Sequence, residues 1–89
     1  MPTVELEIQN IKGLHARASA KFAEVVEAFD ATATVRKDGL EADGDSIMGL
    51  LMLAATIGSF IEVETNGNDA DALSKAITDL VNDKFEEGD

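Results

Sequence analysis

The stretch Gly13-Leu14-His15-Ala16-Arg17-Ala18-Ser19 joins a predicted β-strand to a predicted α-helix. Upstream, residues 3–8 (Thr-Val-Glu-Leu-Glu-Ile) alternate polar and apolar side chains, the pattern of a strand with one buried face. Downstream, four apolar residues recur at helical spacing: Phe22, Val25, Val26 and Phe29. A helix is therefore expected from about Ala16 to Phe29. The only histidine of the chain lies where this helix begins, and the unpaired N–H groups of a helix start attract anions.

The side chains of this stretch suit phosphoryl chemistry. The imidazole of His15 is a nucleophile that can take up a phosphoryl group and release it again. Arg17 adds a planar fork of donors that matches phosphate oxygens. Other interpretations stay open at this point, because a lone histidine in a loop is often just polar, and this one could also bind an anion or act as an acid or base.

The charge of the chain is uneven. The net charge is −11, which argues against binding to nucleic acid or to an anionic membrane surface. Three of the seven basic residues (Lys12, Arg17 and Lys21) surround His15, and no acidic residue falls between Asn10 and Ala23. The sequence thus predicts a basic island on an acidic protein, which would attract a phosphoryl group and orient a partner.

The remaining elements follow with short connections. Residues 32–36 and 40–42 are predicted to form a hairpin around the turn Lys37-Asp38-Gly39. Ser46 is a predicted N-cap, followed by a short helix whose buried face is Ile47, Leu50, Leu51 and Ala54. A strand at 60–64 and a turn at 66–68 lead to a last helix, with Asp69 as its cap and a buried stripe of Leu73, Ile77, Leu80 and Val81. The order β-α-β-β-α-β-α predicts an α+β fold, an open-faced sandwich with the helices on one face of the sheet.

Length and composition restrict the class of protein. A chain of 89 residues supports one hydrophobic core, so one domain is expected over residues 1–89. No apolar run approaches the ~20 residues of a membrane helix, and no secretory signal is visible, so we expect no membrane insertion and a cytoplasmic location. The absence of cysteine and the single histidine argue against disulfides and a metal site, and no glycine-rich nucleotide loop is present.

A second motif, Asp45-Ser46-Ile47-Met48-Gly49-Leu50-Leu51-Met52-Leu53, begins thirty residues after His15. Together with Gly13–Arg17 it makes the whole chain resemble the HPr family, the histidine-containing phosphocarriers of the bacterial phosphoenolpyruvate-dependent phosphotransferase system. The resemblance implies a four-stranded antiparallel sheet in the order 1-4-2-3 with three helices on one face. It also implies a monomer without a cofactor of its own, because phosphoenolpyruvate and magnesium are used by enzyme I.

The resemblance assigns roles to individual residues. His15 is expected to accept a phosphoryl group on Nδ1 from phosphorylated enzyme I and to pass it to an enzyme IIA. The N–H groups of Ala16 and Arg17, with the Arg17 side chain, are expected to hold the phosphoryl oxygens. The chain would thus be a carrier and not an independent catalyst. The expected docking residues are Ala20, Glu24, Ile47, Met48 and Leu51.

Two positions need separate comment: Ala18 departs from the family pattern, and Ser46 has two interpretations. Ala18 stands where the family usually has proline, which suggests the regulatory nitrogen-related branch and leaves transport and regulatory roles both open. Ser46 serves either as an N-cap alone or, by resemblance, as the site that HPr kinase/phosphatase modifies. Asp45 precedes it where the family often has a basic residue, and an acidic neighbour opposes a second anion.

The alternative function is that of a small acidic interaction module. In that interpretation His15 and Arg17 bind an anion without any phosphorylation of the imidazole. An independent enzyme is disfavoured, because a single histidine without an enclosed polar cluster offers no general acid–base pair.

Overall fold

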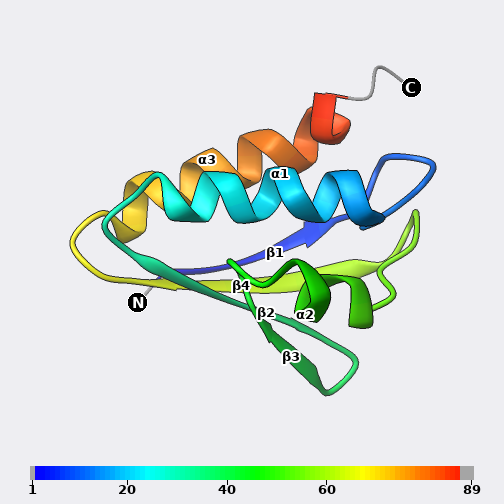
Figure 1. The fold of residues 1–89 in the computed structure, drawn as a ribbon, viewed down its shortest axis with the longest axis horizontal. Helices are drawn as coiled ribbons and strands as arrows, with labels where there is room; N and C mark the ends of the chain where they lie inside the picture. Colours follow the sequence, from blue (N-terminus) through cyan, green and yellow to red (C-terminus); the bar gives the residue numbers. More distant parts are fainter. Residues whose placement is uncertain (1, 87–89) are drawn as a thin grey trace.

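The computed structural model describes residues 2–86 and has the expected order of elements (Figure 1). The strands are β1 (Thr3–Glu7), β2 (Thr32–Lys37), β3 (Leu40–Asp43) and β4 (Phe60–Asn66). The helices are α1 (Ala16–Glu27), α2 (Ile47–Met52), α3 (Ala70–Asn82) and a short 3₁₀ turn, η1 (Lys84–Glu86).

The four strands form one antiparallel sheet in the order β1-β4-β2-β3. Val63 of β4 lies opposite Val4 of β1 on one side and opposite Val35 of β2 on the other. Along β1, β2 and β4, every second residue is buried or half-buried under the helices, so one face of the sheet belongs to the core and the other faces water. The α+β class and the sheet order are thus confirmed.

The core lies between the apolar face of the sheet and the helices. Phe22 of α1, Leu73 and Ile77 of α3, and Ile61 and Val63 of β4 are all fully buried within it. The helices α1 and α3 run side by side over the sheet, and α2 packs against α1 and β3 (Figure 1). None of the helices in residues 2–86 is long and apolar enough to cross a membrane.

The predicted ends of the elements need small corrections. The first helix ends at Glu27 instead of Phe29, where the N–H groups of Ala28 and Phe29 donate to the carbonyls of Val25 and Val26, three residues back instead of four. Strand β4 continues to Asn66, two residues beyond the predicted end.

The predicted buried face of the short helix is wrong in part. Leu50 is buried and Leu51 half-buried, but Ile47 is 42% exposed. Ala54 lies beyond the helix end and is exposed, while Leu53 takes its place in the core. A helix of six residues is too short to present a stripe of two full turns, so the chain that follows it supplies the missing contact.

The cap predicted at Asp69 is right in position but not in its hydrogen bond. Asp69 occupies the N-cap position of α3, but its side chain makes no capping hydrogen bond. Its carboxylate instead accepts a hydrogen bond from the N–H of Asp30 at 2.9 Å. This bond joins the segment after α1 to the start of α3. In the last helix Leu73, Ile77 and Val81 are buried as predicted, and Leu80 is half-buried.

Candidate functional site

His15 is the N-cap residue of α1, at the end of a loop that is fixed on both sides. Its backbone is extended (φ −75°, ψ −179°), and its side chain makes no capping hydrogen bond. Just before it, the N–H of Leu14 donates to the carbonyl of Ala55 at 2.9 Å, which joins this loop to the segment between α2 and β4. His15 is half-buried, so the loop holds the imidazole at the surface rather than in the core.

Gly13 permits the close approach of the two segments. Its φ is +65°, and a Cβ added there would lie 2.3 Å from the carbonyl oxygen of Ala55. Any other residue would combine left-handed backbone strain with a clash against backbone that cannot move aside. The glycine of the motif therefore positions His15 through the backbone.

The first turn of α1 offers several unused donors. The first backbone hydrogen bond of the helix runs from the N–H of Ser19 to the carbonyl of His15 at 2.8 Å. Two earlier carbonyls accept from side chains instead, that of Gly13 from Asn10 Nδ2 and that of Leu14 from Ser19 Oγ. Within residues 2–86, the N–H groups of residues 16–18 consequently have no bonded acceptor. Unpaired N–H groups at the start of a helix favour a bound anion.

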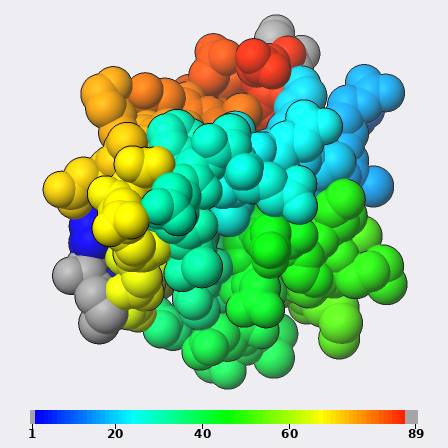
Figure 2. Space-filling view, turned by 60° about the vertical axis from the view of Figure 1, so that its left-hand side comes forward, coloured from blue at the N-terminus to red at the C-terminus, as the bar shows by residue number. Residues whose placement is uncertain are grey.

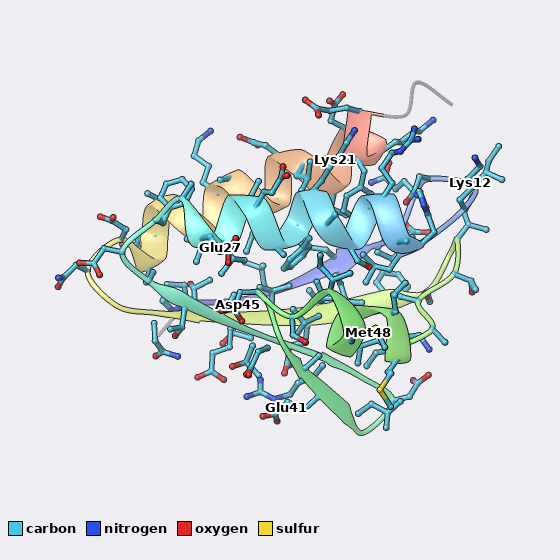
Figure 3. The ribbon with its side chains drawn as sticks, viewed as in Figure 1. Lys12, Lys21, Glu27, Glu41, Asp45 and Met48 are labelled. Carbon is cyan, nitrogen blue, oxygen red and sulfur yellow. The ribbon has the colours of Figure 1, made fainter. Side chains whose placement is uncertain are left out.

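The basic island differs from the expectation in one respect. Lys12 and Arg17, which flank His15 in the sequence, are exposed, whereas Lys21 of α1 (labelled in Figure 3) is engaged with η1. Its Nζ donates to the carbonyl of Phe85 at 2.8 Å and lies 3.5 Å from a Glu86 carboxylate oxygen. The fold thus adds a negative charge to a region where the local sequence has none.

The expected docking residues lie on the neighbouring helices α1 and α2. In α1, Ala20 is half-buried and Glu24 exposed. In α2, Met48 is 70% exposed and Leu51 half-buried. The two helices pack against each other and lie on one face of the molecule, α1 in cyan above α2 in green (Figure 2).

Met52, which is not among the expected docking residues, is also an exposed apolar residue of α2, at 75%. Its spacing of four residues from Met48 places both methionines on one side of a helix. A group of exposed apolar side chains on a soluble domain is typical of a partner site, and methionine adapts to different partners.

Ser46 is the N-cap of α2, as predicted. Its Oγ accepts a hydrogen bond from the N–H of Gly49 at 3.0 Å, and the side chain is half-buried. Asp45, immediately before it, is exposed. The capping function of Ser46 is therefore visible directly.

The opposite, uncovered face of the sheet has a separate charge network. Arg36 lies 2.8–3.3 Å from the carboxylates of Glu41, Glu62 and Glu64. Hydrogen bonds to Glu64 and Glu62 raise the pKa of Arg36, and the bond from Arg36 lowers the pKa of Glu64. Among residues 2–86 there is no group of three or more histidine, cysteine or acidic residues arranged to hold a metal ion.

The chain is similar to known proteins over most of its length. The model of the family described as "PTS-HPr: PTS HPr component phosphorylation site" matches residues 2–83. The phosphocarrier protein HPr of Neisseria meningitidis serogroup A is 48% identical over 84 residues, which cover 94% of each chain. The phosphocarrier protein NPr of Shewanella violacea is 42% identical over 83 residues, covering 93% of this chain and 91% of that protein. A crystal structure of HPr from Thermoanaerobacter tengcongensis is 36% identical, with a TM-score of 0.93 over 98% of both chains.

Proposed function

Because the chain belongs to the HPr family of phosphocarrier proteins, we propose that it carries a phosphoryl group on Nδ1 of His15 between proteins of a phosphotransferase system. The observation that carries this proposal is the placement of the chain's only histidine as the N-cap of α1, next to unused backbone donors. A half-buried surface position suits a carrier, because both the donor and the acceptor protein must reach the same nitrogen.

The transfer step requires a neutral imidazole with its proton on Nε2, so that Nδ1 has a free lone pair. Nδ1 attacks phosphorus, the N–P bond to the imidazole of the donor protein breaks, and a new N–P bond forms on His15. The N–H groups of Ala16 and Arg17 and the exposed guanidinium of Arg17 stabilise the charge on the phosphoryl oxygens. Donation to the next protein reverses the same step, so the carrier needs only modest stabilisation of the phosphoryl group.

The partners follow from the same proposal. Phosphorylated enzyme I, which uses phosphoenolpyruvate and magnesium, is the donor, and an enzyme IIA is the acceptor. Both would dock on the surface formed by Ala20, Glu24, Ile47, Met48 and Leu51. The protein would work as a cytoplasmic monomer without a cofactor and without turnover of a small molecule. Relatives named HPr and NPr both match, so a role in sugar uptake and a role in regulatory signalling both fit this proposal.

Regulation at Ser46 is a finer proposal. A phosphate on Ser46 would place negative charge beside Ile47 and Met48 and weaken the docking of enzyme I. The Ser46→Asp variant should imitate this effect while keeping the helix cap, because aspartate is also a good N-cap. The test is incubation with ATP and an HPr kinase/phosphatase, with Ser46→Ala as the control. Absence of labelling in the native chain would leave Ser46 with its capping role alone.

The decisive test of the function is phosphorylation by enzyme I. The native protein and His15→Ala are incubated with phosphoenolpyruvate, magnesium and enzyme I, and acid-labile phosphate is measured. We expect phosphate on the native chain and none on His15→Ala, with unchanged circular dichroism because His15 is not a core residue. Equal labelling of the two would overturn the assignment, and absence of labelling in both would favour an anion-binding module.

A further inference from the structure

Ala18 occupies a position in the first turn of α1 that the transfer step described above does not use. With His15 as the N-cap, Ala16 is the first helical residue, Arg17 the second and Ala18 the third. The side chain of an N-cap residue normally places its acceptor near the N–H groups of the second and third helical residues. A phosphoryl group on Nδ1 would add acceptor oxygens to the side chain of the N-cap residue. By the geometry of capping, these oxygens would lie near the N–H groups of Arg17 and Ala18.

The N–H of Ala18 is also an unsatisfied buried donor. Ala18 is 0% exposed, and within residues 2–86 its N–H has no bonded acceptor. The nearest helical acceptor, the carbonyl of Leu14, receives Ser19 Oγ at 3.2 Å instead. Buried backbone donors are nearly always paired in native proteins, because an unpaired one costs about 1–3 kcal/mol. Among the described residues the N–H of Ala18 has no acceptor, and a phosphoryl oxygen on His15 could be that acceptor.

We propose that the backbone N–H of Ala18 is a third backbone donor to the phosphoryl group of His15. The inference rests on the proposed function and adds a positioning group to it. A hydrogen bond to a charged acceptor is stronger than a neutral one, so this N–H stabilises the phosphorylated form relative to the free form. The chain should retain its phosphoryl group more firmly than the same chain without this N–H.

Two variants remove the donor in different ways. Ala18→Pro deletes the N–H, and proline is tolerated in the first turn of a helix. Replacement of Ala18 by L-lactic acid in a chemically assembled full-length chain changes the amide to an ester, which removes the N–H and keeps the methyl side chain. The matched control is Ala18→Gly, which keeps the N–H and loosens the backbone instead of stiffening it.

The readout is the equilibrium of phosphoryl exchange with enzyme I, measured as the phosphorylated fraction by ³¹P NMR. We expect the proline and ester variants to shift this equilibrium away from the phosphorylated protein by about ten- to a hundredfold, the size of one charge-assisted hydrogen bond. The glycine control should stay within about twofold. The amide proton signal of Ala18 in the native protein should move downfield on phosphorylation, which a purely structural residue would not show.

The possible failures are distinguishable. If the native protein is not phosphorylated at all, the proposed function fails. If it is phosphorylated but its Ala18 amide signal stays in place, the inference fails and the proposed function stands. If the equilibrium is unchanged in both the proline and the ester variants, the inference also fails and the proposed function stands. The NMR signal needs no variant, so the inference stays testable even where a variant does not fold.

Discussion

At the scale of single residues, the site depends on which charges remain available near His15. Arg17 is exposed, and within residues 2–86 it forms no ion pair, whereas Lys21 is engaged by Phe85 and Glu86. The sequence predicts a cluster of three cations around His15, but the fold engages Lys21 and leaves Lys12 and Arg17 exposed. The sequence could not indicate this difference, because the groups that engage Lys21 lie more than sixty residues away.

Arg17→Glu should slow phosphorylation by enzyme I strongly, by about tenfold or more, because it places an anion where the phosphoryl oxygens must lie. Arg17→Ala should have a milder effect, since it removes only the guanidinium. The rate of formation of acid-labile phosphate at low salt measures both. Lys75→Glu, an exposed site on α3 with the same change in charge, is the control and should leave the rate nearly unchanged. A native rate for Arg17→Glu would show that Arg17 has no role.

At the scale of elements, a local feature of the backbone places each functional residue. Gly13 allows the loop before α1 to meet the segment after α2, and Ser46 caps α2. The close approach of Gly13 to Ala55 was not predicted, because the two residues lie far apart in the chain. The cap at Ser46 was predicted, because serine has a well-defined preference for this position. Asp69 has the same preference and still does not cap its helix, because Asp30 supplies a distant donor that its carboxylate takes instead.

Gly13→Ala should destabilise the fold by about 2 kcal/mol or more, because strain at φ +65° adds to a Cβ contact of 2.3 Å with the Ala55 carbonyl oxygen. Gly39→Ala is the matched control: its φ is +83°, but an added Cβ meets nothing within 4 Å. It should cost about 1 kcal/mol from strain alone. Urea unfolding of the two variants measures the difference, and equal destabilisation would mean that the contact at Gly13 relaxes freely.

Met48→Asp should weaken the binding of enzyme I with little change in melting temperature, because Met48 is 70% exposed in the free protein. Phe60→Asp is the control: Phe60 is 54% exposed at the start of β4, on the face of the sheet away from the helices. It should leave binding unchanged. Titration of enzyme I and a thermal melt are recorded for each variant. A large fall in melting temperature with unaltered affinity would place Met48 in the core instead.

The charge network on the uncovered face of the sheet should make the free energy of unfolding depend on pH in the acid range. Arg36 holds the folded-state pKa of Glu64 below its ordinary value of 4.5. A carboxyl whose pKa is lower in the folded state stabilises the fold above its unfolded pKa, and this stabilisation is lost as the pH falls through the folded value. The stability difference between the native protein and Arg36→Met should therefore shrink as the pH is lowered below about 4.5. Urea unfolding from pH 7 to pH 3 measures it, and a constant difference would contradict the account.

At the scale of the whole molecule, the sequence predicted the order of elements because alternation and helical spacing are local patterns. The sheet order followed from the family resemblance, since periodicity does not say which strands are neighbours. The turn η1 was not predicted. Its three residues have positive φ values of 53° to 64° without any glycine, and it is held by the buried side chain of Phe85. Only packing against the complete core explains that conformation, so no local signal could have revealed it.

The central claim is that the imidazole of His15 forms a covalent bond to phosphorus. Since His15 is the only histidine, a chain labelled with ¹⁵N-histidine reports from this ring alone. After incubation with phosphoenolpyruvate, magnesium and enzyme I, we expect the Nδ1 resonance to shift and to show coupling to phosphorus, while Nε2 keeps its proton. Ring resonances that stay unchanged while nearby amide signals move would contradict the claim, and would mean that the site binds an anion without accepting it.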